Sequence, residues 1–208
     1  PVEAAIVAGE METGVTLMGM TKKMDAGPVA GVERVPIRTS DTAPVLRERL
    51  ALACAPLLQK HLASLGGGST RPVPQDETQA TYTCKLDTAD AHVDFAATAV
   101  ELERRVRALQ PWPGVAVEHG GHPLKIGAAI VIEEASAGEP GTVLRADDAG
   151  VDVATGAGVL LLLALQRPGG RMLPVAEFLR GYRLAAGEAL PSRPMRPLVA
   201  AKPFPKGH

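Results

Sequence analysis

Asp25 is the residue whose neighbours most favour chemistry. It lies in the run Met24-Asp25-Ala26-Gly27, between two longer apolar stretches. A carboxyl group flanked by apolar or small residues is a candidate for a raised pKa and for proton transfer. Gly27 permits a tight bend beside it. The alternative is a turn aspartate that only caps its own backbone, and the local residues alone favour that alternative.

Two expected strands position this carboxylate. Residues 14–20 alternate β-branched and apolar residues and are bounded by glycine. Residues 28–37 form a second run with valine at every third position. Both patterns are typical of short strands. The sequence therefore predicts a strand, a loop that carries Asp25, and a second strand.

Helices are expected on both sides of these strands. Residues 1–9 start with proline and end with glycine, which favours a short helix. Residues 40–42 offer capping side chains for a long helix that Gly66 and its neighbours end. Its apolar stripe is expected to contain Val45, Leu46, Leu50, Leu57, Leu58 and Leu62. Residues 1–65 are thus expected to be an α/β remnant, the end of a sheet domain whose other strands lie upstream.

The rest of the sequence predicts a linker and a small β domain. Residues 66–91 are rich in Gly, Pro, Thr and Gln and form the expected linker. A helix over residues 95–109 precedes a hairpin, three more short strands and a short helix over residues 174–182. Five short strands with glycine-rich turns favour an OB-like β-barrel over residues 92–190. A basic, proline-rich and disordered tail is expected over residues 191–208.

Composition narrows the class of protein. The chain has 208 residues, a net charge of −1 and 46% hydrophobic residues, as in a soluble globular protein. Cys54 and Cys84 lack any metal-binding spacing and indicate reduced thiols in a cytoplasmic protein. His119 and His122 flank two glycines, and without further ligands at zinc spacing they predict a turn and no metal site. The longest apolar run is too short to cross a membrane.

Positive charge is concentrated in the second half of the chain. Residues 165–208 carry eight basic residues and two acidic ones, a local charge of 8 − 2 = +6. A small barrel with a basic flank is a candidate binder of a nucleic-acid backbone. The basic residues are Arg167, Arg171, Arg180, Arg183, Arg193, Arg196, Lys202 and Lys206. Arg104, Arg105 and Arg107 add to this charge, although a solvated helix face balanced by glutamates explains them equally well.

Three motifs resemble a known family. Glu12-Thr-Gly-Val-Thr16, followed by Met24-Asp25-x-Gly27-Pro-Val29, resembles the formyltransferases that use 10-formyltetrahydrofolate. The linker run Pro74-Gln-Asp-Glu-Thr78 and the later Arg107-Ala-Leu-Gln-Pro-Trp-Pro-Gly114 narrow the resemblance to the methionyl-tRNA formyltransferase family. The resemblance covers residues 1–190.

The resemblance implies a reaction and its residues. A formyl group would pass from 10-formyltetrahydrofolate to the amino group of methionyl initiator tRNA, in a monomeric cytoplasmic enzyme. Asp25 matches the catalytic aspartate, and Lys23 and Met24 fall in the folate loop. If the second domain binds tRNA, the positive charge of the sequence predicts that the binding residues are Arg104, Arg105, Arg107, Lys125, Arg167 and Arg171.

The same resemblance implies that the chain is incomplete as an enzyme. The family also uses an asparagine and a histidine before a Ser-Leu-Leu-Pro loop, and this chain contains no asparagine. We therefore expect the 208 residues alone to be inactive. Two alternatives are a tRNA-binding module without catalysis and a formyltransferase that acts on another amine.

Overall fold

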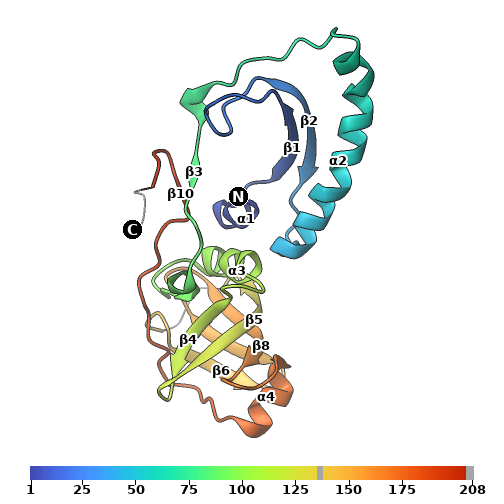
Figure 1. The fold of residues 1–208 in the computed structure, drawn as a ribbon. Helices are drawn as coiled ribbons and strands as arrows, with labels where there is room; N and C mark the ends of the chain where they lie inside the picture. The colour runs from blue at the N-terminus through green and yellow to red at the C-terminus, as the bar shows by residue number, and fades with distance from the viewer. Residues whose placement is uncertain (135–137, 205–208) are drawn as a thin grey trace. The chain divides into compact units, whose positions relative to one another are not determined.

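The computed structural model describes residues 1–134 and 138–204, which form two compact units. The first unit holds residues 1–84 with the C-terminal segment from Val199, and the second holds residues 85–198 (Figure 1). Lys206, which the sequence places in the basic segment, lies outside the described residues.

The first unit is built on one hairpin and two helices. Strand β1 (Glu12–Met18) pairs antiparallel with β2 (Val29–Pro36), so Asp25 lies in the loop between them, as predicted. Helix α1 (Val2–Ala8) ends at Gly9, whose left-handed φ of 75° closes the last turn. Short elements follow in the linker, namely η1 (Glu77–Gln79) and β3 (Tyr82–Thr83), which pairs with β10 (Val199–Ala200).

Helix α2 (Ala43–Gly66) packs against the hairpin through a narrower face than the sequence predicts. Leu46, Leu50 and Leu57 are buried, and α-helical geometry places them within about 40° of one another around the helix axis. Leu58 and Leu62 lie on another side and are exposed by 49% and 60%. Val45 is also exposed. The expected single stripe is therefore wrong for these three residues.

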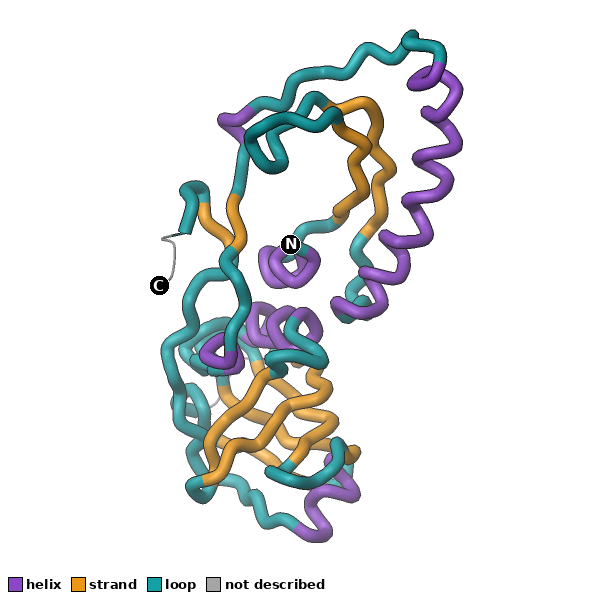
Figure 2. Tube along the Cα trace, in the orientation of Figure 1, coloured by secondary structure: helices purple, strands orange, loops and turns teal. Residues whose placement is uncertain are grey.

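The second unit is an antiparallel sheet packed against two helices (Figure 2). Its strand order is β4-β5-β8-β7-β6, and β9 pairs with β8. Helix α3 (Ala99–Ala108) packs on β5 and β8, and helix α4 (Val175–Gly181) packs on β8. The strands are β4 (Val115–His119), β5 (His122–Ile132), β6 (Val143–Asp147), β7 (Gly150–Ala154), β8 (Val159–Gln166) and β9 (Leu173–Pro174).

The OB-like barrel is not confirmed. The five expected strands form, but within the described residues β4 and β6 are the two edges of an open sheet. The edge of β6 is covered by residues 187–190: the backbone N–H of Val143 donates to Glu188 O at 2.8 Å, and that of Leu190 donates to Gly141 O at 2.8 Å. Covering an edge in this way removes a site for unwanted strand pairing.

Helix α3 starts later than predicted. The expected start was residue 95, but Phe95 is fully buried ahead of the helix. Thr98 and Glu101 form a capping box: the Thr98 hydroxyl accepts from the Glu101 N–H at 3.2 Å, and the Glu101 carboxylate accepts from the Thr98 N–H at 2.8 Å. This reciprocal pair fixes the first turn at Ala99.

The C-terminal segment is ordered over its described part, so the expectation of a disordered tail from residue 191 is wrong there. Leu198 is 3% exposed. The Arg193 N–H donates to Val93 O at 2.7 Å, and Ser192 Oγ accepts from the Phe95 N–H at 2.9 Å. Residues 191–198 therefore pack along the second unit, with Leu198 in its core.

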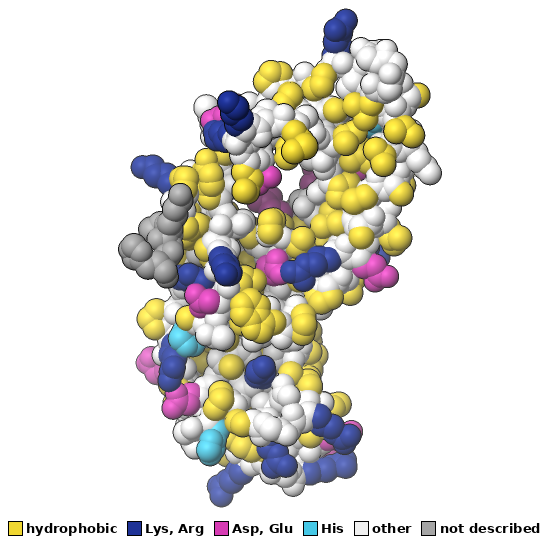
Figure 3. Space-filling view, viewed as in Figure 1, with side chains coloured by type: hydrophobic (Ala, Val, Ile, Leu, Met, Phe, Trp, Pro, Cys, Tyr) yellow, Lys and Arg dark blue, Asp and Glu magenta, His cyan; other side chains and the backbone are white. Residues whose placement is uncertain are grey.

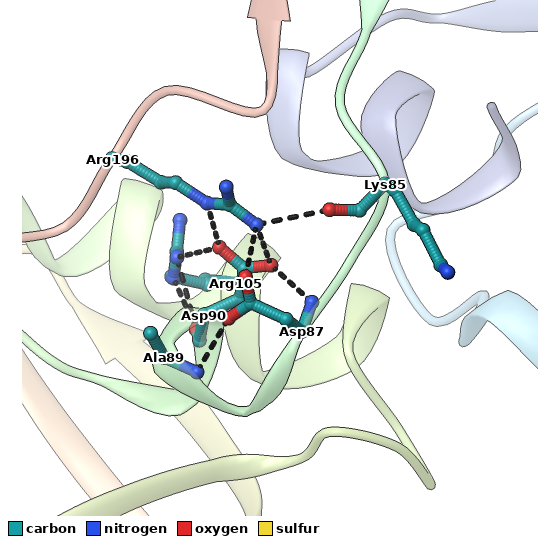
Figure 4. A network of polar contacts seen from close by, with 6 residues as sticks. All are labelled: Lys85, Asp87, Ala89, Asp90, Arg105 and Arg196. Carbon is teal, nitrogen blue, oxygen red and sulfur yellow. Dashed lines mark hydrogen bonds and ion pairs between the residues drawn. The ribbon is translucent and has the colours of Figure 1, made fainter. Parts of the chain in front are cut away.

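A buried carboxylate holds this segment (Figure 4). Asp90, in η2 (Thr88–Ala91), is fully buried and accepts from Arg196 Nε at 2.6 Å and from Arg196 Nη2 at 2.8 Å. The Asp87 N–H donates to the same carboxylate at 2.8 Å. Arg105 donates to the Asp90 backbone carbonyl at 2.9 Å, and Arg196 also donates to Lys85 O at 2.9 Å. The network thus joins the first and the last residues in the sequence of the second unit to α3.

Replacing Arg196 with alanine should destabilise the second unit by about 3 kcal/mol, because Asp90 would remain buried without its main partner. Urea unfolding followed by fluorescence of Trp112, the single tryptophan, measures this loss. Arg193→Ala is a matched control three residues away. It removes an ion pair with Glu118 in which both side chains are about half exposed, and it should cost less than about 1 kcal/mol. Equal losses in both variants would contradict the assignment.

The contribution of Asp90 should depend on pH. Burial alone would raise the pKa of this carboxyl, but the hydrogen bonds from Arg196 and the Asp87 N–H, with the charges of Arg196 and Arg105, lower it below its ordinary value of 3.8. The stabilisation is therefore complete above 3.8 and is lost as the pH falls toward the lower, folded-state pKa. The stability difference between the wild type and Arg196→Ala should be largest at neutral pH and shrink in acid. A difference that grows in acid would contradict this linkage.

Candidate functional site

The loop that carries Asp25 has a tightly closed base. The Gly19 N–H donates to Pro28 O at 2.9 Å across the two ends of the loop. Gly27 is buried against the same backbone, and a Cβ atom there would lie 1.7 Å from Gly19 O. Only glycine fits at this contact. These contacts hold the two ends of the loop, at Gly19 and Pro28, close together.

Asp25 has an unusual backbone conformation. Its φ of 57° makes it the only non-glycine residue with a positive φ in the described part of the chain. Aspartate tolerates this left-handed region better than most residues, but the conformation still has to be held by its surroundings. The apolar neighbours of Asp25 in the sequence predict that its carboxyl group is shielded from water. This prediction is wrong, because Asp25 is exposed and Met24 is 85% exposed.

A pocket of about 740 Å³ lies beside Asp25. Its lining includes Lys23 and Met24, so the three residues that the sequence assigns to catalysis and folate binding share one pocket. The other wall comes from the linker, with Asp76 and Glu77. This wall was not predicted as part of a site, although the linker motif that contains it contributed to the resemblance.

The pocket carries more negative than positive charge. Lys23 Nζ lies 2.7 Å from Glu77 Oε2, and this hydrogen bond raises the pKa of the lysine. Hydrogen bonds from the hydroxyl and N–H of Thr78 lower the pKa of Asp76. With Lys23 paired to Glu77, the carboxylates of Asp25 and Asp76 are left to attract a cation such as an ammonium group. The pocket can therefore hold an amine next to a potential proton acceptor.

Gln75 also lines the pocket and contacts the loop directly. Its side-chain amide donates to Asp25 O at 2.9 Å and to Gly27 O at 2.7 Å. Sequence reasoning did not identify this residue as part of a site. Fifty residues separate it from Asp25, and no local pattern links the two.

The three arginines of α3 have different environments. Arg105 is 4% exposed and binds Asp90, so it is not available to a nucleic acid in this structure, contrary to the expectation. Arg107 is paired with Glu103 at 2.7 Å and is 13% exposed. Arg104 is partly exposed. The helix therefore offers less positive charge than its sequence indicates.

A basic cluster forms around α4 instead. Arg167 and Arg171 line a pocket of about 180 Å³, and Arg180 and Arg183 line one of about 510 Å³. Both pockets share Tyr182, and Glu177 lies in the smaller one. Figure 3 shows basic side chains gathered at the α4 end of the second unit. The sequence had identified Arg180 and Arg183 only as part of the charged segment.

Lys125 lies beside the same cluster. It is exposed on β5, where it pairs in register with Gln166, the residue before Arg167. Three of the six predicted tRNA-binding residues, Lys125, Arg167 and Arg171, are thus brought together by β5, β8 and the turn before β9. A polyanion that lies on this surface would meet all three.

Residues 1–134 and 138–204 contain no cluster of metal-binding side chains and no helix that could span a membrane. No group of three metal-binding side chains occurs there. His119 ends β4 next to the expected hairpin turn, with its ring nitrogens 2.8 Å from Tyr182 Oη and 3.0 Å from Glu188 Oε2. No described helix has the length and apolar character needed to cross a membrane. Cys54 and Cys84 are both free thiols.

Two models of known protein families match the chain. A model described as "Formyl transferase" matches residues 1–60, and one described as "Formyl transferase, C-terminal domain" matches residues 85–183. The chain belongs to the formyltransferase family. The first match contains the Asp25 loop, and the second contains the open sheet and α4.

Several relatives of this chain are named methionyl-tRNA formyltransferase. The protein of that name from Bordetella parapertussis is 44% identical over 88% of this chain and 59% of its own length. The one from Paraburkholderia phymatum is 41% identical over 90% of this chain and 58% of its own length. The chain therefore spans less than two thirds of the relatives it matches.

A solved structure supports the fold. The crystal structure of HypX from Aquifex aeolicus in complex with tetrahydrofolic acid matches 92% of this chain and 36% of its own, with a TM-score of 0.62. At 24% identity this similarity shows a formyltransferase-like fold and nothing finer.

Proposed function

We propose that this chain supplies part of a methionyl-tRNA formyltransferase, which transfers a formyl group from 10-formyltetrahydrofolate to the amino group of methionyl initiator tRNA. The relatives of that name, at 41–44% identity over most of the chain, support the proposal. The arrangement around Asp25 supports a catalytic role for this part of the chain. A carboxylate, a lysine and an exposed methionine share one pocket there.

The chemistry requires a group that moves protons. The amine attacks the formyl carbon, a tetrahedral oxyanion forms, and protons leave the amine and reach the departing folate nitrogen. Asp25 would accept a proton from the amine or orient the group that does. The acidic lining of the pocket fits a substrate whose reactive end is a cationic amine. Lys23 and Met24 would border the folate on the side of the loop.

The basic cluster around α4 favours tRNA as the acceptor. Arg167, Arg171, Arg180, Arg183 and Lys125 provide a surface for phosphates. A small amine substrate needs no such surface, which argues against a formyltransferase for another amine. The same surface supports the second candidate function, a tRNA-binding module without catalysis.

Catalysis by Asp25 can be tested in a fusion of this chain to the unmatched remainder of the Bordetella parapertussis relative. The fusion should formylate methionyl-tRNA, and the 208-residue chain alone should not. Asp25→Asn keeps the size and the turn but removes the proton acceptor, so turnover should fall roughly 100-fold or more. Single-turnover formylation of methionyl-tRNA measures the effect.

Glu48→Gln is the control, because Glu48 is an exposed carboxylate on α2 and does not line the pocket. Its turnover should stay within a few-fold of the parent fusion. If Asp25→Asn retained most of the turnover, Asp25 would be a structural residue. If the fusion bound tRNA without formylating it, the module without catalysis would be the better description.

The second unit should bind tRNA mainly through phosphates. The affinity of the 208-residue chain for tRNA should fall roughly tenfold or more when salt rises from about 50 to about 200 mM. Arg171→Glu should weaken binding several-fold, to a similar degree for initiator and elongator tRNAs. Lys60→Glu, an exposed charge reversal on α2, should change affinity much less. Filter binding or fluorescence anisotropy measures both, and an affinity independent of salt would contradict phosphate contacts.

A further inference from the structure

The side chain of Gln75, which lies outside the hairpin, is hydrogen-bonded to the loop that carries Asp25. The primary amide of Gln75 donates to the backbone carbonyls of Asp25 and Gly27, at 2.9 and 2.7 Å. These carbonyls lie on either side of Ala26. A single side chain thus fixes the orientation of two of the peptide groups around the left-handed residue.

Glutamine is well suited to this contact. A primary amide nitrogen carries two hydrogens, and both are used here. The opposite amide orientation would place the side-chain oxygen against two carbonyl oxygens, so the hydrogen-bond pattern assigns the nitrogen. A shorter or acidic side chain could not make the same pair of contacts.

The backbone around Gln75 is itself anchored to the hairpin. Val73, two residues earlier, exchanges two backbone hydrogen bonds with Val29 of β2, at 2.7 and 2.8 Å. This bridge sets the position from which Gln75 reaches the loop. The other link between the loop and the linker, Lys23 with Glu77, is an exposed ion pair and contributes little order.

We propose that Gln75 is a positioning residue for Asp25. It holds the φ of 57° at Asp25 and thereby fixes the direction in which the carboxylate leaves the loop. This inference rests on the proposed function, in which Asp25 acts on the formyl acceptor. A misplacement of about 1 Å in a reacting group can cost on the order of 100-fold in rate.

The kinetic test uses the same fusion protein. Gln75→Ala should lower kcat by about tenfold to 100-fold and leave KM for tRNA within about twofold, because the loop is displaced but the basic cluster around α4 is unchanged. Gln59→Ala is the matched control, since Gln59 is exposed on α2, lies outside the lining of the pocket and makes no side-chain hydrogen bond among the described contacts. It should keep kcat within about twofold.

Gln75→Glu separates positioning from packing. The glutamate has the same shape, but its carboxylate has no hydrogen to donate, so the variant should be as slow as Gln75→Ala at neutral pH. Protonation of the glutamate restores one hydrogen-bond donor, so the rate of the Gln75→Glu variant relative to the wild type should rise as the pH is lowered. A purely structural role would lower the melting temperature without this pH dependence, and that result would overturn the proposal.

A second readout does not need activity. In the 208-residue chain, NMR coupling constants and carbon shifts report whether Asp25 is left-handed. Wild type and Gln59→Ala should show a left-handed Asp25, and Gln75→Ala should lose it. A left-handed Asp25 in Gln75→Ala would overturn the proposal even if the fusion were inactive. A normal kcat in Gln75→Ala, together with an inactive Asp25→Asn variant, would also overturn the positioning role of Gln75 but would leave the proposed function intact.

Discussion

The conformation of Asp25 depends on contacts that close its loop from both sides. The base of the loop is closed by the Gly19–Pro28 hydrogen bond and by the contact of Gly27 with Gly19 O, which leaves no space for a side chain. The linker closes the other side through the Val29–Val73 bridge. Between these supports a non-glycine residue keeps a positive φ, which an unsupported loop would relax at once. Under the proposed function, the hairpin and the linker together hold this carboxylate at the edge of the pocket.

The arginines of the second unit divide into structural and exposed groups, and sequence alone does not separate them. Arg105 and Arg196 bind a buried aspartate, and Arg145 pairs with Asp147 and Asp152. Each of these side chains is paired with an acid of the same unit. The exposed arginines around α4 have no ion pair with any described residue, so their charge is open to a partner in solution. Under the proposed function this division decides which positive charges meet tRNA.

The parts of the fold that could be predicted are those set by neighbouring residues. The hairpins, the left-handed end of α1 at Gly9 and the short helix α4 follow from turn residues and local periodicity. The predicted start of α3 is wrong although Thr98 and Glu101 have the sequence of a capping box, because the apolar spacing of the helix extends back to Phe95. The covered edge of the open sheet, the path of residues 191–198 and the hydrogen bonds of Gln75 depend on contacts between residues 45 or more positions apart. No local pattern contains them.

The exposure of Asp25 shows why apolar neighbours in sequence do not define a dry site. Met24 projects into solvent, so it shields nothing, and burial of the carboxylate would have to come from groups distant in sequence. In this structure the pocket beside Asp25 is about 740 Å³ and open to water on the side of the loop. Under the proposed function the substrates themselves have to fill that space. Water exclusion, which strengthens every electrostatic contact in a reacting complex, would then arise on binding and would not be a standing property of the chain. Such a site needs a carboxylate whose position is set before the substrates arrive, which is the role that the loop closure and Gln75 can fulfil.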